Sequence, residues 1–298
     1  MNEPILYLEC YSGISGDMTV ASLLDLGADP QVLINGLNSL KVDGYHVAIG
    51  RRIKSGIDAG DFDVILENHD HTHPAQANSP LQEHDPLPMH HLTHEYPHPH
   101  EHPHPHEHPQ TLGHQQKHEY MGLPHEHRNL NEINIIIDQS DISSYAKELA
   151  KKIFYIVAAA ESKAHAKPIE HVHFHEVGAI DSIVDIVATA ICIDNLNIRR
   201  VIVPTIWEGT GQITCQHGIL PIPVPAVANI AADYQLRLHI TKVEGELVTP
   251  TGAAIVAALK TEDVLPEEFR ILKVGLGAGK RNYEQASGIL RSLLIAEK

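Results

Sequence analysis

Residues 171–185 read HVHFHEVGAIDSIVD and carry the strongest local signal in the chain. The first five positions alternate as in a β-strand, which places three histidines on one face and two apolar side chains on the other. Gly178 permits a turn, and Asp181 is a candidate N-cap for the apolar helix that follows. Asp181 and Asp185 then share one face of that helix, where two carboxylates repel each other unless a cation or a proton lies between them. The stretch therefore predicts a strand, a turn and a helix that meet at one polar corner.

The side chains expected at this corner are His173, His175, Glu176, Asp181 and Asp185. Neutral imidazole and carboxylate are the ligands that nickel, zinc, manganese and magnesium choose among. Each residue by itself is more simply explained as a surface histidine, a helix cap or a solvated carboxylate, and only their coincidence predicts a metal site. Glu161 and His165 lie four residues apart just upstream and could add a ligand, although a surface ion pair explains them more simply.

The composition excludes several classes of protein. The 298 residues are 43% hydrophobic, enough for a sizeable core. A formal charge of -16 with only 22 lysines and arginines argues against a nucleic-acid partner, which would require a basic stripe. Cys10, Cys192 and Cys215 are widely spaced, which indicates a reducing cytoplasm without a disulfide framework. No apolar run approaches membrane-spanning length, so no membrane partner is expected.

Histidine is concentrated in one part of the chain. Of 24 histidines, 17 lie between His69 and His127, in a stretch rich in Pro, Glu and Gln. Residues 68–128 have too little apolar surface to offset their chain entropy, so we expect a disordered insert that binds nickel or zinc weakly. The alternative is a spacer of accidental composition. The insert would divide one α/β domain into a first part, 1–67, and a remainder, 129–298.

A strand–loop–helix pattern opens the chain. Residues 5–10 are apolar, residues 11–18 read YSGISGDM, and a helical pattern follows. The amides of such a loop and helix start can bind anions. The candidate nucleotide ligands are Ser12, Gly13, Ser15 and Gly16. The loop lacks the lysine of a Walker motif, so a bound phosphate would need a metal ion, which Asp17 could hold. The alternative is that Ser15 or Asp17 only caps the helix.

A second helix start of this kind lies in residues 244–254, which read EGELVTPTGAA. Pro250 fits the first helical turn and Thr249 is the expected cap. The candidate nucleotide ligands here are Glu246, Thr249, Thr251 and Gly252. Lys280 and Arg281 directly follow a glycine-rich turn and could also contact a phosphate.

The remaining patterns predict a mixed α/β (α+β) fold, with a sheet and flanking helices interrupted by the insert. Helices are expected at 30–42, 143–165, 180–196 and 226–232, strands at 45–51, 62–66, 133–137, 200–204, 236–243, 271–279 and 289–295, and a hairpin at 213–222. The loop after the strand at 45–51 contains Arg51, Arg52 and Lys54. It could steer a phosphate ligand, although a solvated basic loop is the commoner explanation.

Four motifs taken together resemble one family. They are SGISGDM at 12–18, HFHEVGAIDSIVD at 173–185, CQHG at 215–218 with Pro221 and Pro223, and EGELVTPTG at 244–252. Their order is similar to that of the nickel insertion protein family LarC. The resemblance covers nearly the whole chain apart from the insert, and a histidine-rich insert of variable length is itself similar to what the family carries.

The resemblance implies a CTP-dependent nickel chelatase, a lyase-type enzyme. It would insert nickel into pyridinium-3,5-bisthiocarboxylic acid mononucleotide, forming a nickel–carbon and two nickel–sulfur bonds, and so make the nickel-pincer cofactor of lactate racemase. CTP would be split to CMP and pyrophosphate with manganese or magnesium. Full-length members continue into a C-terminal domain, which this chain would need as a separate chain or a missing segment. A homo-oligomer is left open.

Motif position and chemistry together give the expected roles. The expected catalytic residues are Asp17, His173, His175, Glu176 and Asp181, and the expected metal ligands are these five together with Asp185. Two other functions stay open. In a nickel storage or delivery protein, deleting residues 69–127 would remove nickel binding, whereas a chelatase would keep its CTP-dependent chemistry. A metal-dependent phosphohydrolase would cleave simple phosphate esters without any pyridinium nucleotide.

Overall fold

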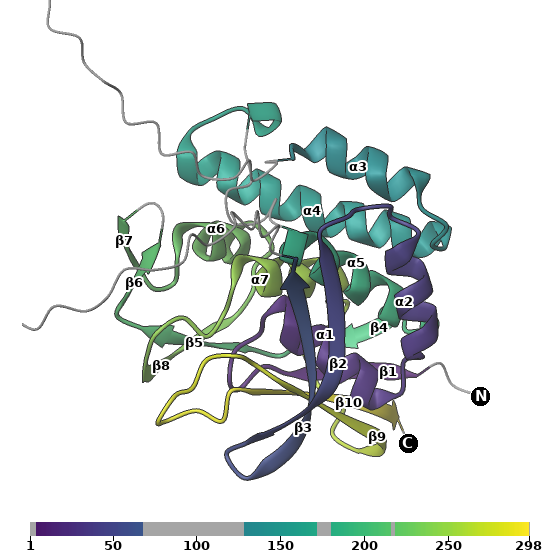
Figure 1. The fold of residues 1–298 in the computed structure, drawn as a ribbon. Helices are drawn as coiled ribbons and strands as arrows, with labels where there is room; N and C mark the ends of the chain where they lie inside the picture. Colours follow the sequence, from purple (N-terminus) through teal and green to yellow (C-terminus); the bar gives the residue numbers. More distant parts are fainter. Residues whose placement is uncertain (1–3, 68–127, 172–179, 216–217, 298) are drawn as a thin grey trace, which may run out of the picture. The chain divides into compact units, whose positions relative to one another are not determined.

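A six-stranded mixed sheet forms the base of the fold in Figure 1. The computed structural model describes residues 4–67, 128–171, 180–215 and 218–297. The strands of this sheet are β1 (Ile5–Glu9), β2 (Tyr45–Lys54), β3 (Ile57–Leu66), β4 (Arg200–Ile202), β9 (Phe269–Ala278) and β10 (Ile289–Glu297). Their order is β2-β3-β9-β10-β1-β4, with β1 antiparallel to β10 and parallel to β4.

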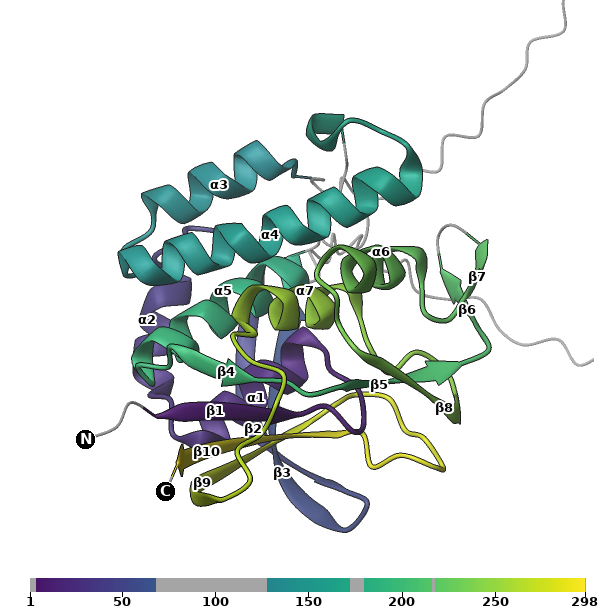
Figure 2. The same cartoon turned by 180° about the vertical axis from the view of Figure 1, so that it is seen from behind.

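Helices cover one face of this sheet in two layers. They are α1 (Gly16–Leu26), α2 (Pro30–Asn38), α3 (Leu130–Gln139), α4 (Ser144–His165), α5 (Ile180–Asn195), α6 (Pro225–Asp233) and α7 (Pro250–Leu259). α1 packs on β3, β9 and β10, and α5 packs on α1, α2 and α4. α4 forms the outer layer with α3, as Figures 1 and 2 show. Gly275 and Gly277 lie where α1 crosses β9, because a side chain at either position would collide with backbone atoms of α1.

The opposite face of the sheet is covered in part by the segment between α7 and β9. This segment crosses in front of β1 and β10 in Figure 2. Leu265 and Phe269 pack there on a small buried cluster made of Ile5, Tyr7, Ile202, Leu293 and Ile295. The β1 strand therefore contributes to apolar layers on both of its faces, as expected of a central strand.

Two short strand pairs lie beside the main sheet. β5 (Ile206–Thr210) and β8 (Leu238–Glu244) are parallel, and β6 (Gln212–Cys215) and β7 (Gly218–Pro221) form the expected hairpin. β5 follows the sheet directly, since Ile206 forms a bridge with Cys10 at the end of β1.

The strand predicted at residues 133–137 is wrong, because this segment belongs to helix α3. Asn129 and Glu132 form a reciprocal capping box at its start, which satisfies amides that the first turn leaves without partners. Ile133 and Ile137 are fully buried one helical turn apart, while Ile135 between them is 54% exposed. The β-branched composition favoured a strand, and the cap together with the four-residue spacing outweighs it.

The basic loop predicted after residue 51 is also wrong, because β2 and β3 are longer than expected and meet at Ser55 and Gly56. Both turn residues have positive φ, 50° and 77°, as a two-residue hairpin turn of type I′ requires. Arg51, Arg52 and Lys54 therefore lie in strand β2, and their side chains are held by carboxylates and carbonyl groups of the protein itself.

Most other predictions are confirmed, including the mixed α/β class. The strand expected from residue 171 does not begin there, because Ile169–His171 is a short 3-10 turn. Residues 172–179 and the insert lie outside the described residues. All three cysteines are free thiols, two of them buried. In the described residues no helix is long and apolar enough to cross a membrane.

Candidate functional site

The two loops that were predicted to bind nucleotide lie against each other. The Ile14 amide donates to the Leu247 carbonyl oxygen at 3.0 Å, and the Thr249 amide donates to the Ile14 carbonyl oxygen at 3.1 Å. Gly13 has a φ of 80°, and a Cβ there would collide with the Leu247 carbonyl group. A Cβ at Gly252 would collide with the Ile14 carbonyl group. The structure therefore uses both glycines for the close approach of the two loops.

The starts of helices α1 and α7 are occupied by side chains of the protein. Thr249 Oγ1 accepts from the Gly252 amide at 3.1 Å, as expected of an N-cap. Ser15 is the N-cap residue of α1, but its hydroxyl donates to the Asp17 carboxylate and makes no capping bond. The amide of Asp17 donates to the Asp185 carboxylate. A carboxylate thus lies where an anion was expected, so a phosphate bound beside it needs a cation between the two.

The surroundings of Asp185 are unfavourable for a charged carboxylate that has no bound cation. Its Oδ1 atom is buried and has no hydrogen-bond partner. Burial, and then the proximity of Asp17 and Asp181, raise the pKa of Asp185 well above its ordinary value. Burial also raises the pKa of Asp17. Gly16 lies directly against the Asp185 carboxylate, so any larger residue at this position would displace it. Such a group gains stability when it binds a proton or a cation.

Asp181 occupies a different position from the one predicted. It is the second residue of α5 and is exposed, and its Oδ1 accepts from the Ser182 amide at 2.8 Å. It therefore lies in the first turn of the helix and does not act as the N-cap. Asp181 and Asp185 do share one face of α5, and this face points to α1.

These groups open onto a cavity of about 400 Å³, which we call the acidic cavity. Its charged lining residues are Asp17, Asp63, Asp181, Asp185, Glu246, Lys280 and Arg281. Its hydroxyl-bearing lining residues are Ser15, Ser182, Thr249 and Thr251. Five carboxylates face two cations, so the lining has an excess of negative charge. A bare phosphate would be repelled, whereas a divalent cation, or a phosphate that arrives with one, would be attracted.

The lining fits a hard divalent cation such as manganese or magnesium. Oxygen ligands are what these ions require, and Asp185 offers a buried oxygen without another partner. Among the residues that the structure describes, no three His, Cys, Asp or Glu side chains are grouped closely enough to form a metal site by themselves. Magnesium commonly takes one or two carboxylates and completes its shell with water and phosphate oxygens. The acidic cavity therefore suits a cation that binds together with a nucleotide phosphate.

Two basic residues from the turn after β9 complete the wall. Lys280 Nζ lies 2.7 Å from Asp61 and 3.6 Å from Asp63. Arg281 Nη1 lies 2.9 Å from Glu246 Oε2. Asp63 was not predicted to belong to the site. It could have been predicted from its spacing, because Asp61 and Asp63 lie two residues apart in β3 and therefore share one face of the strand.

Glu208 is a second residue that the sequence reasoning missed. It is fully buried in β5, and its Oε1 accepts from the amides of Gly209, Leu247 and Val248 at 2.7, 2.8 and 3.1 Å. Burial raises its pKa to about 6 against the opposing effect of these amides. Glu208 thus fixes the backbone directly after Glu246, whose side chain lines the acidic cavity. The sequence indicates a buried carboxylate here only through the position of a glutamate between apolar residues in 206–210.

The remaining predicted residues have varied positions. Ser12 Oγ lies 2.9 Å from Ser287 Oγ and lines a smaller adjoining cavity of about 140 Å³. His173, His175 and Glu176 lie outside the described residues. Because α5 begins at Ile180, the helix that follows them is the one that brings Asp185 to the acidic cavity.

Comparison with known proteins identifies the family. The model of the family described as nickel insertion protein matches residues 6–298. The chain belongs to the nickel insertion protein family. This confirms the resemblance inferred from the four motifs.

Similar members of the nickel insertion family come from several bacteria. The protein from Alkaliphilus metalliredigens is 51% identical over 98% of this chain and 60% of its own length. Those from Acetivibrio thermocellus and Geobacillus kaustophilus are 38% and 36% identical, over 93% and 98% of this chain and 57% and 60% of their own lengths. All three are named pyridinium-3,5-bisthiocarboxylic acid mononucleotide nickel insertion protein. The chain thus spans about 60% of the length of these relatives. No solved structure matches the chain.

Proposed function

We propose that this chain forms the nucleotide-binding part of an enzyme that inserts nickel into pyridinium-3,5-bisthiocarboxylic acid mononucleotide. One observation supports this most strongly: the starts of α1, α5 and α7 meet at one acidic cavity whose deepest carboxylate, Asp185, has an oxygen atom without a partner. Family relatives carry this activity in their names. The domain responsible would be assembled from residues 1–67 and 129–298 on either side of the histidine-rich insert.

The residues of the acidic cavity have distinct proposed parts. Asp185 would hold a manganese or magnesium ion together with water and phosphate oxygens, and Asp17 and Asp181 would add negative charge to the same cavity. The ion would supply the positive charge that a nucleotide phosphate needs beside these carboxylates. Thr249 and Thr251 offer hydroxyl groups, and Lys280 offers an ammonium group, to the phosphate oxygens. Ser12, Gly13, Ser15, Gly16 and Gly252 shape the two loops that carry these groups. Glu246 orients Arg281 through their ion pair.

The finer proposal adds CTP as the driving nucleotide and the lactate racemase cofactor as the product. His173, His175 and Glu176 would present nickel, the substrate metal, because they directly precede the helix that carries Asp181 and Asp185. The region by which the relatives exceed this chain would complete the reaction, either in the same protein or as a separate chain. We further propose that the reaction takes place in the cytoplasm.

The test measures CMP release from CTP in the presence of the pyridinium mononucleotide, nickel and manganese. The part of the Alkaliphilus metalliredigens relative that this chain does not cover is supplied as a second chain. We expect release that depends on all of these components and that falls about 100-fold in the Asp185→Asn variant. The matched control is Asp233→Asn, at an exposed position on α6 where the carboxylate pairs with Lys163.

Two outcomes would contradict the proposal. If no combination of components gives turnover, the chain is not the enzyme. If CTP or simple phosphate esters are hydrolysed without the pyridinium nucleotide, the acidic cavity belongs to a phosphohydrolase. A third possibility is a nickel storage protein, which deletion of residues 69–127 distinguishes from the enzyme. A storage protein would lose its nickel binding, whereas the enzyme would keep its CTP-dependent reaction.

A further inference from the structure

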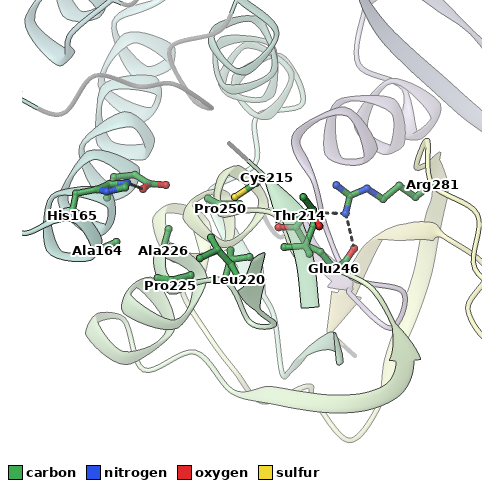
Figure 3. A pocket seen from close by; sticks show the side chains of 13 residues that line it. Ala164, His165, Thr214, Cys215, Leu220, Pro225, Ala226, Glu246, Pro250 and Arg281 are labelled. Carbon is green, nitrogen blue, oxygen red and sulfur yellow. Dashed lines mark hydrogen bonds and ion pairs between the residues drawn. The ribbon is translucent and has the colours of Figure 1, made fainter. Parts of the chain in front are cut away.

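A second cavity adjoins the acidic cavity and has a different character. It measures about 280 Å³, just below the ~300–1,000 Å³ usual for small-molecule sites. It is shown in Figure 3. We call it the ring chamber. Its walls are mainly apolar and include Ala164, Ile213, Leu220, Val224 and Ala226. They come from α4, the β6–β7 hairpin and the start of α6. None of these elements was predicted to take part in nucleotide binding.

The two cavities share part of one wall. Glu246, Pro250 and Arg281 line both of them. In Figure 3, the Arg281–Glu246 ion pair lies at one end of the chamber and His165 lies at the other. His165 Nε2 is 3.5 Å from Glu161 Oε2, which confirms the expected ion pair and adds that it borders a cavity. A ligand can therefore extend from the acidic cavity past Arg281 into an apolar space that has an ion pair at each end, Arg281–Glu246 and His165–Glu161.

We propose that the ring chamber binds the flat pyridinium ring of the mononucleotide while the acidic cavity binds its phosphate. A mononucleotide has an aromatic ring and a phosphate group on opposite ends of one ribose, so it requires an apolar and a charged compartment side by side. The apolar walls exclude water from the ring faces, and burial of such a face favours binding. Arg281 and His165 would contact the two anionic groups on the ring edge by exchanging their present partners, Glu246 and Glu161, for them. This inference rests on the proposed function for the identity of the substrate.

Cys215 gives the chamber a feature that a site for an ordinary base would not need. Its thiol is partly exposed and lines the chamber, whereas Cys10 and Cys192 are buried in the core. The Cys215 sulfur atom therefore lies beside the space in which the thiocarboxylate-bearing edge of the ring would bind.

The experiment measures binding of two commercial probes by calorimetry in the presence of manganese. Nicotinic acid mononucleotide carries a pyridinium ring with one carboxylate, and ribose 5-phosphate carries the same sugar and phosphate without a ring. The wild-type chain should bind the ring-bearing probe about tenfold more tightly. Ala164→Trp fills the chamber from an exposed position of α4, so it should remove this difference and leave ribose 5-phosphate binding unchanged.

The matched control is Ala228→Trp, which adds the same side chain at an exposed position of α6 outside the chamber and should keep the tenfold difference. Retained ribose 5-phosphate binding shows that each variant is folded. The inference is overturned if the wild-type chain shows no preference for the ring, if neither probe binds, or if the preference survives Ala164→Trp.

Neither probe involves nickel or CTP, so this result is separate from the proposed reaction. A chain that prefers the ring but catalyses no insertion contradicts the reaction and supports the chamber. Normal insertion by the Ala164→Trp variant contradicts the chamber and supports the reaction.

Discussion

The acidic cavity and the basic β2–β3 hairpin differ in how completely their charged groups are satisfied. In the hairpin, Arg51 contacts Asp25 and Asp58 at 2.6 Å each, and buried Lys54 donates to the carbonyl groups of Gly279 and Arg281. In the acidic cavity, carboxylates are gathered against one another and one buried oxygen has no partner. Since unsatisfied buried polar groups are destabilising, proteins retain them mainly where a ligand binds. This difference favours the acidic cavity over the basic hairpin as the proposed ligand site.

The largest effect is expected from Asp185→Asn. The change removes the negative charge that faces Asp17 and Asp181, so manganese-dependent binding of nicotinic acid mononucleotide should fall about 100-fold. Stability should rise, with a melting temperature higher by about 2–4 °C, because repulsion and the burial of a charge are both relieved. Calorimetry and a thermal melt measure the two quantities on one sample. A loss of binding together with a loss of stability would instead indicate that Asp185 is a structural residue.

The next effect concerns the contact between the two loops that frame the acidic cavity. Gly252→Ala places a methyl group against the Ile14 carbonyl group, so we expect a loss of about 1–3 kcal/mol in the free energy of unfolding. Gly50→Ala in the hairpin is the control, because a Cβ there meets nothing within 4 Å. Urea denaturation measures both. Equal stability of the two variants would mean that the loops do not pack as described.

A smaller effect is expected from Glu208, which fixes the backbone beside the acidic cavity. Its pKa is raised from 4.5 to about 6, so its contribution to stability is fully present below pH 4.5 and is lost as pH rises through 6. The wild-type chain should therefore lose about 2 kcal/mol relative to Glu208→Gln over this window. Denaturation curves of both chains at pH 4.5 and pH 7 give the difference. Parallel pH profiles would show that Glu208 does not titrate there.

The smallest effect is expected in the hairpin itself. Arg51→Ala removes two ion pairs of a half-exposed side chain, so stability should change less than in any of the other variants, because solvent screens such pairs. Binding of nicotinic acid mononucleotide should not change, because the guanidinium does not line the acidic cavity. A clear loss of affinity in calorimetry would restore the earlier idea that the hairpin steers phosphate.

How far the sequence predicts this site depends on the range of the interactions involved. Thr249 as a cap and Asp181 and Asp185 on one helix face follow from local spacing, and the structure bears out both placements. The wrong strand at 133–137 shows that a capping box can outweigh residue composition. The ring chamber could not be predicted, because its walls come from α4, the β6–β7 hairpin and α6. The proximity of such distant segments follows from tertiary packing and not from any local pattern.

The central claim is that the acidic cavity holds a divalent cation together with a nucleotide phosphate. Anomalous diffraction from crystals grown with manganese and nicotinic acid mononucleotide tests it most directly. The predicted result is a manganese peak about 2.0–2.5 Å from Asp185 Oδ1, with a phosphate oxygen in the same coordination shell. A phosphate bound without manganese, or manganese bound elsewhere with Asp185 Oδ1 still lacking a partner, would contradict the account.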